Sequence, residues 1–149
     1  MKTNIFPKWS YGTKTNGVRT VFRILLGVFL LYTGTSHLTF SRLEFTAQVP
    51  DWLPLSANLV VIVSGIAELA LGLSLVILTK WKALTGWAAA LFFVLIFPGN
   101  IAQYVNQTDA FGLNSDTARL IRLFFQPVLV VWALWATGAY KAWVNRKKA

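Results

Sequence analysis

Hydrophobic residues gather in four long runs along the chain, and short segments rich in charge, proline or other polar residues separate them. Each run is about 20 residues long, the length that an α-helix needs to cross a hydrocarbon core of about 30 Å. The pattern therefore predicts an all-α, polytopic membrane protein, a bundle of four transmembrane helices over residues 19–38, 57–78, 83–105 and 117–140.

The segments around these runs complete the expected organisation. A basic segment, residues 1–18, precedes a single membrane domain, residues 19–140, and a basic tail, residues 141–149, follows it. The longest connection inside the domain, residues 39–56, contains Pro50, Trp52 and Pro54, which we expect to form an outer cap over the bundle.

Composition supports a membrane protein and narrows its chemistry. Hydrophobic residues make up 56% of the chain and charged residues 13%, with a mean hydropathy of +0.57. The absence of cysteine excludes disulfides, iron–sulfur clusters and thiolate zinc sites, and a single histidine excludes bis-histidine haem ligation within one chain. We therefore expect no metal site and no catalytic residue.

The distribution of charge predicts the orientation. Lysine and arginine concentrate in the N-terminal segment, in the connection between the second and third runs, and in the tail, whereas most acidic residues lie in the other two connections. The positive-inside rule then places both termini in the cytoplasm, and we expect the bacterial inner membrane. The net charge of +9 thus indicates a topology signal and contact with anionic lipid, not nucleic-acid binding.

Glu68 is the one formal charge within the second run and lies near its middle. An ionised carboxylate at that depth costs about 2.5–3.5 kcal/mol on insertion scales, so it needs a partner. Glycines at helical spacing in the first and second runs predict that these two helices pack closely, which favours an ion pair between Glu68 and Arg23. Arg122, in the fourth run, is the alternative partner.

Helix-breaking residues in the third and fourth runs predict a polar chamber. Pro98 and Gly99 interrupt the third run and Pro127 the fourth, and each proline frees a backbone carbonyl. Non-helical backbone at membrane depth is tolerated only where protein or water satisfies it. We expect a polar or ligand-binding chamber that opens to, or lies near, the outer face and is lined by polar side chains: Glu68, His37, Asn100, Gln103, Arg122 and Gln126.

Five short segments resemble the DoxX family of bacterial membrane proteins. They are GTSHLTF, VPDWLP, SGIAELALG, FPGNIAQY and RLFFQP, in this order along the chain. The resemblance implies a four-helix membrane bundle. Its relatives include a small membrane subunit of a thiosulfate:quinone oxidoreductase, a component of an oxidative-stress oxidoreductase complex, and receptor assembly factors. Fold carries over from such a likeness more readily than function does.

Three functions remain open from the sequence. The first is a non-catalytic accessory or assembly factor, or a small subunit of a membrane complex, whose partner is another membrane protein or a second copy of the chain. The second is a membrane subunit of an oxidoreductase that binds quinone, because the chain itself carries no redox centre and a quinone or lipid is the only cofactor it could hold. The third is a small transporter or channel for an anionic or weakly acidic solute.

Overall fold

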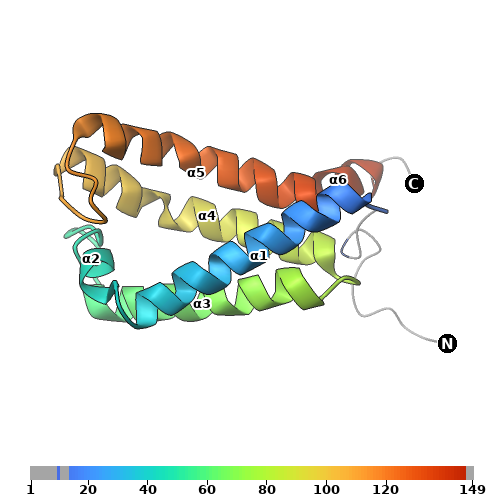
Figure 1. The fold of residues 1–149 in the computed structure, drawn as a ribbon, viewed down its shortest axis with the longest axis horizontal. Helices are drawn as coiled ribbons and strands as arrows, with labels where there is room; N and C mark the ends of the chain where they lie inside the picture. Colours follow the sequence, from blue (N-terminus) through green and yellow to red (C-terminus); the bar gives the residue numbers. More distant parts are fainter. Residues whose placement is uncertain (1–9, 11–13, 147–149) are drawn as a thin grey trace.

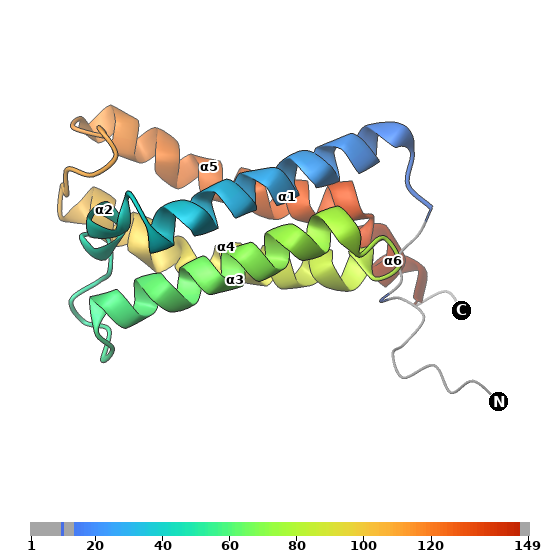
Figure 2. The same cartoon turned by 60° about the horizontal axis from the view of Figure 1, so that its bottom comes forward.

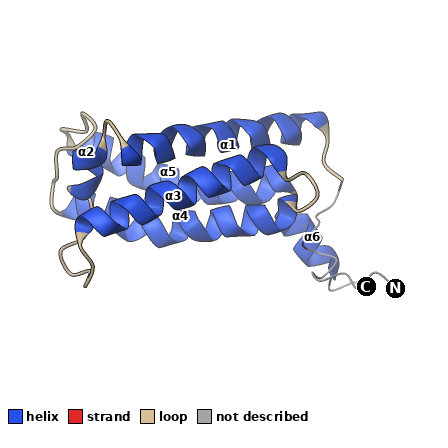
Figure 3. Ribbon diagram, turned by 90° about the horizontal axis from the view of Figure 1, so that it is seen from below, coloured by secondary structure: helices blue, strands red, loops and turns tan. Residues whose placement is uncertain are grey.

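The computed structural model describes residue 10 and residues 14–146. This part of the chain is all-helical, without a strand, which confirms the predicted fold class (Figure 3). Four helices are long and apolar enough to cross a membrane, and two short helices accompany them. In chain order the helices are α1 (Gly17–Leu38), α2 (Arg42–Thr46), α3 (Ala57–Ile77), α4 (Lys82–Val105), α5 (Asp116–Thr137) and α6 (Ala139–Arg146).

Local chemistry explains where the long helices begin. The side chains of Asn16, Ser56 and Ser115 each accept a hydrogen bond from a backbone N–H three residues later, at the starts of α1, α3 and α5. Such caps satisfy one of the N–H groups that a helix leaves unpaired at its N-terminus.

The long helices end within two residues of the expected boundaries except at the end of the fourth, and one short helix is additional. The fourth span stops at Thr137 and not at residue 140, because Gly138 adopts the left-handed conformation (φ 70°) that terminates helices, and α6 begins directly after it. The connection over residues 39–56 contains α2, which the sequence pattern did not indicate. Residues 1–9, 11–13 and 147–149 of the two basic terminal segments lie outside the described residues.

The four long helices form two antiparallel pairs, α1 with α3 and α4 with α5 (Figures 1 and 2). One end of the bundle carries α2 and the connection between α4 and α5, and we call it the α2 end. The opposite end carries the start of α1 and helix α6, and we call it the α6 end. The segments expected at the outer face therefore gather at the α2 end.

Glycines hold α1 against α3. Gly27 faces Gly72, and Gly34 faces Gly65, so that a Cβ atom added at any of the four would come within 2.9 Å of an atom of the opposite helix. Glycine at these positions lets the two backbones approach more closely than any other residue would allow. This agrees with the expected packing of the first span on the second.

The apolar core lies where the two pairs meet. Leu26, Leu30 and Phe93 are almost fully buried there, in one cluster with residues of α3 and α5. Large apolar side chains also cover the outward faces of the four long helices, as at Val28, Val63, Leu95 and Val131. Outward apolar faces on four helices of this length are compatible with a multi-pass membrane protein.

Candidate functional site

A cavity of about 520 Å³ lies between the two helix pairs, toward the α2 end. Side chains from all four long helices line it, and residues 45–53, which include the end of α2, contribute the remaining wall. Its size falls within the range of roughly 300–1,000 Å³ that small-molecule sites occupy. The lining is mainly apolar and aromatic, with a few polar groups at defined positions.

The cavity reaches the side of the bundle between α3 and α4. Val63 of α3 and Leu95 of α4 both line it, and these side chains are 57% and 67% exposed. Because these residues are exposed and also belong to the cavity wall, the cavity opens at the side of the bundle. In a bilayer this opening would face the acyl chains of the lipids. A lipid-soluble molecule could therefore reach the cavity from within the membrane.

Glu68 and His37 meet on one wall of the cavity. His37 Nδ1 lies 2.9 Å from Glu68 Oε2 and 3.0 Å from the carbonyl oxygen of Thr33. Both oxygens can only accept, and Nδ1 carries at most one hydrogen, so the imidazole has a single hydrogen to share between the carboxylate of Glu68 and the carbonyl of Thr33. No described residue other than His37 has a hydrogen-bond donor in reach of Glu68 Oε2, although Glu68 is only 4% exposed.

The expected ion pair between Glu68 and Arg23 is not formed. Arg23 instead donates to the carbonyl oxygen of Leu75, in the last turn of α3, where a cation is favoured by the helix dipole. Leu75 lies seven residues beyond Glu68, or about 10 Å along the helix axis. The glycine contacts fix this stagger, which brings His37 and not Arg23 to the level of Glu68.

An amide pair lies on the α4 and α5 side of the cavity. Asn100 donates to Gln126 Oε1 at 2.9 Å, and Gln126 donates to the carbonyl oxygen of Phe93 at 2.7 Å. Phe93 immediately precedes Val94, whose carbonyl loses its helical donor at Pro98. Gln126 thus ties α5 to the stretch of α4 that the proline interrupts.

Arg122 closes the polar lining at the α2 end. It donates to Gln103 Oε1 at 2.8 Å and to Gln48 Oε1 at 3.0 Å, and Gln48 donates to Gln103 Oε1 at 2.9 Å. Gln48, which is 8% exposed, was missed at the sequence level because it follows a short helix, α2, that the pattern did not indicate. Its position two residues before Pro50 of the expected cap is the signal that could have found it.

The remaining expected residues divide between the cavity wall and its surroundings. Five of the six expected chamber residues line the cavity, and Gln103 lies behind Gln48 and Arg122. Of the expected kinks, Pro98 and Gly99 line the cavity and Pro127 does not. Of the expected cap, Pro50 and Trp52 line it and Pro54 does not.

Residues 26–137 match the family described as a domain of unknown function, DUF8561. The chain belongs to this family. No protein of curated function and no solved structure matches the chain significantly. The resemblance to the DoxX family is therefore wrong, because the family match assigns the region that holds all five quoted segments to DUF8561.

The DUF8561 match contains the whole cavity. The lining extends from Phe29 to Leu129, inside the matched residues, whereas Arg23 and α6 lie outside them. The cavity therefore lies entirely within the DUF8561 domain of this chain. Within the described part of this domain, His, Asp and Glu side chains form no group of three or more that could hold a metal ion.

Proposed function

We propose that this protein is a multi-pass protein of the bacterial cytoplasmic membrane that holds a lipid-soluble ligand in the cavity between its helix pairs. Both termini lie in the cytoplasm, and the chain acts as a non-catalytic accessory protein or small subunit of a membrane complex. The observation that carries the proposal is the buried carboxylate of Glu68, which lines a ligand-sized cavity and to which the described residues offer no donor beyond the one hydrogen that His37 Nδ1 shares with Thr33.

An unsatisfied buried acceptor is costly, which favours a ligand that supplies the missing donor. Leaving such a group without a partner costs about 1–3 kcal/mol, and more where the group is charged. A hydroxyl or amine of an amphiphile would satisfy Glu68 Oε2, while its apolar part would contact the aromatic wall formed by Phe29, Phe45 and Phe92. The side opening between α3 and α4 gives such a molecule a route from the bilayer.

The polar groups of the cavity favour binding over catalysis. Ser64 is a hydroxyl beside His37 and Glu68 in the lining, but no hydrogen bond joins it to His37. A nucleophile needs a base within hydrogen-bond reach. The described side chains therefore offer an orienting site and no activated nucleophile, which supports an accessory role.

The charges at the two ends support the orientation. The described basic residues of the α6 end include Arg19, Lys80 and Lys141, and the four acidic residues other than Glu68 lie toward the α2 end. Under the positive-inside rule this distribution supports a cytoplasmic α6 end.

The test is purification from native membranes in mild detergent, followed by mass spectrometry of the organic extract and of the copurifying proteins. We expect a defined lipid or quinone and a defined membrane-protein partner. Ala67→Phe fills the cavity and should remove the ligand, whereas Ile66→Phe, on the exposed face of the same helix, should retain it. Equal ligand content in both variants would refute binding in the cavity, and repeated recovery without any protein partner would refute the accessory role.

A further inference from the structure

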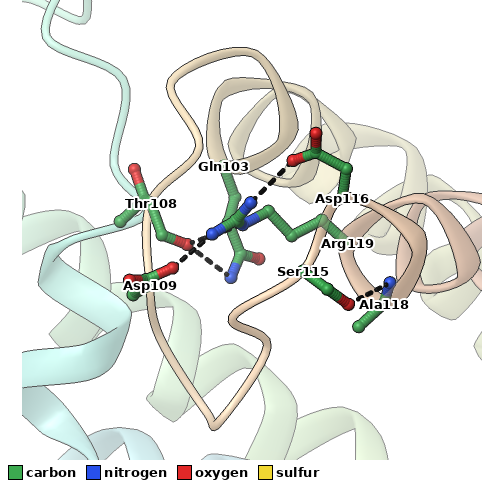
Figure 4. Close-up of polar contacts among 7 residues, drawn as sticks. All are labelled: Gln103, Thr108, Asp109, Ser115, Asp116, Ala118 and Arg119. Carbon is green, nitrogen blue, oxygen red and sulfur yellow. Dashed lines mark hydrogen bonds and ion pairs between the residues drawn. The ribbon is translucent and has the colours of Figure 1, made fainter.

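Arg119 and Arg122 lie one turn apart on α5 but differ in their partners: Arg119 contacts carboxylates, whereas the hydrogen bonds of Arg122 go to neutral amides. Arg119 forms ion pairs with Asp109 and with Asp116, the latter at 2.8 Å, and it donates to the carbonyl oxygen of Thr108 (Figure 4). The charge of Arg119 is thus fully compensated within the protein.

Arg122 forms no ion pair with any described acidic residue. Its two hydrogen bonds go to neutral amide oxygens, and its guanidinium lies 5.0 Å from the centre of the Phe111 ring. A partly buried cation without a counter-charge is costly in an apolar environment. The surroundings of Arg122 therefore favour an anion that the protein does not itself supply.

The position of Arg122 shows how an anion could reach it. The side chain lines the main cavity and also a second pocket, of about 440 Å³, on the α1 and α5 side of the bundle. Thr33, Phe45 and Phe125 are shared by the two pockets as well. Arg122 thus lies where two apolar spaces meet, and the group that it binds can remain attached to an apolar chain.

We propose that Arg122 binds the anionic head group, a phosphate or carboxylate, of a single-tailed amphiphile whose tail occupies the main cavity. Guanidinium groups suit such anions because their N–H donors match the spacing of two anionic oxygens. The inference rests on the proposed function and narrows it: Glu68 selects a polar hydrogen of the ligand, and Arg122 selects an anionic oxygen. A quinone supplies no such anion.

The test compares two probes that differ only by a phosphate, 1-oleoyl-lysophosphatidic acid and 1-oleoylglycerol, by native mass spectrometry of the detergent-purified full chain. We expect the phosphate-bearing probe to bind at least about tenfold more tightly, the effect of one charge-assisted hydrogen bond. Arg122→Gln should bring the two affinities together, and Arg122→Lys should retain part of the preference.

Arg119→Gln is the matched control, because it removes the same charge one turn away without touching the cavity. Equal affinities of the unmodified protein for both probes, or the same loss in Arg119→Gln as in Arg122→Gln, would overturn the inference while leaving the proposed function intact. Absence of binding by either probe and of any native ligand would overturn both. Glycerol 3-phosphate, which lacks the tail, should not displace the probe, and displacement at equal concentration would assign the site to a free anion and overturn the amphiphile.

Discussion

Helix α3 contacts its two neighbours in opposite ways. Toward α1 it presents Gly65 and Gly72, and the backbones are so close that an added Cβ atom would meet backbone or side-chain atoms of α1. Toward α4 it presents Ser64 and Ala67, and at the α2 end the helices leave a cavity open to the side. We call the tight α1–α3 interface the closed seam and the α3–α4 interface that borders the cavity the open seam. One helix thus takes part in an interface that holds the fold together and in one that leaves space for a ligand.

The two seams meet at His37 and Glu68. His37 extends from α1 beside Gly65, in the closed seam, and its imidazole stacks on Phe45 with ring centres 3.4 Å apart. Glu68 lies one turn further along α3 and faces the open seam. The pair therefore couples the packing of α1 on α3 to the polarity of the cavity.

The largest effect is expected from removing His37. His37→Leu removes the one described donor within reach of the buried Glu68 carboxylate, and leaving such an acceptor unsatisfied costs about 3 kcal/mol, the upper end of the range because the group is a carboxylate. Glu68→Leu should cost less, because the remaining imidazole keeps the carbonyl of Thr33 as a hydrogen-bond partner. The measurement is the free energy of unfolding in detergent micelles for both single variants and the double variant.

The double variant decides whether the two side chains interact. If they do, His37→Leu combined with Glu68→Leu should be more stable than the sum of the single losses predicts. Strict additivity would show that each side chain contributes independently, and the two seams would then be uncoupled.

A smaller loss is expected from crowding the closed seam. In Gly72→Ala the new methyl group would lie 2.7 Å from the carbonyl oxygen of Gly27 and 2.9 Å from the backbone nitrogen of Leu31, so the helices must separate. Overpacking of this kind costs typically 1–3 kcal/mol, less the gain of a few tenths to about 1 kcal/mol from the helix propensity of alanine.

Gly17→Ala is the matched control on α1, since nothing lies within 4 Å of the added methyl group. Thermal unfolding of the two variants in the same detergent gives the comparison. A similar transition temperature for Gly72→Ala and Gly17→Ala would mean that close backbone approach does not stabilise this seam.

The sequence predicted the spans and the glycine seam well, because both depend on local pattern. Apolar runs of membrane length and glycines at helical spacing can be counted directly from residues such as Gly27 and Gly72. The end of the fourth span was missed because Gly138 lies inside an apolar run and acts through its φ angle alone.

Polar pairing could not be predicted because it depends on stagger between helices. Counting residues from the expected helix boundaries placed Arg23 within reach of Glu68. The contact between Gly34 and Gly65 fixes another relative position of α1 and α3 along their axes, which brings His37 beside Glu68. Gln48 could not be placed, because its position depends on how α2 folds back onto the bundle. The residues that line a cavity can be proposed from their side-chain type and their depth in the membrane. Their hydrogen-bond partners cannot, because these depend on how the helices are positioned relative to one another.

The smallest effect on stability is expected from adding a larger side chain to α3 at the open seam, where α3 borders the cavity. Ala67→Phe adds a far larger side chain to α3 than Gly72→Ala does, yet Ala67 faces the cavity, so the ring can enter existing space. The change in the free energy of unfolding should stay below about 1 kcal/mol, the lower limit for overpacking a filled core. Unfolding of Ala67→Phe and Gly72→Ala, measured side by side after delipidation, tests this. A loss at Ala67 as large as that at Gly72 would mean that the two seams of α3 are equally closed in solution, and the cavity would then have no room for a ligand.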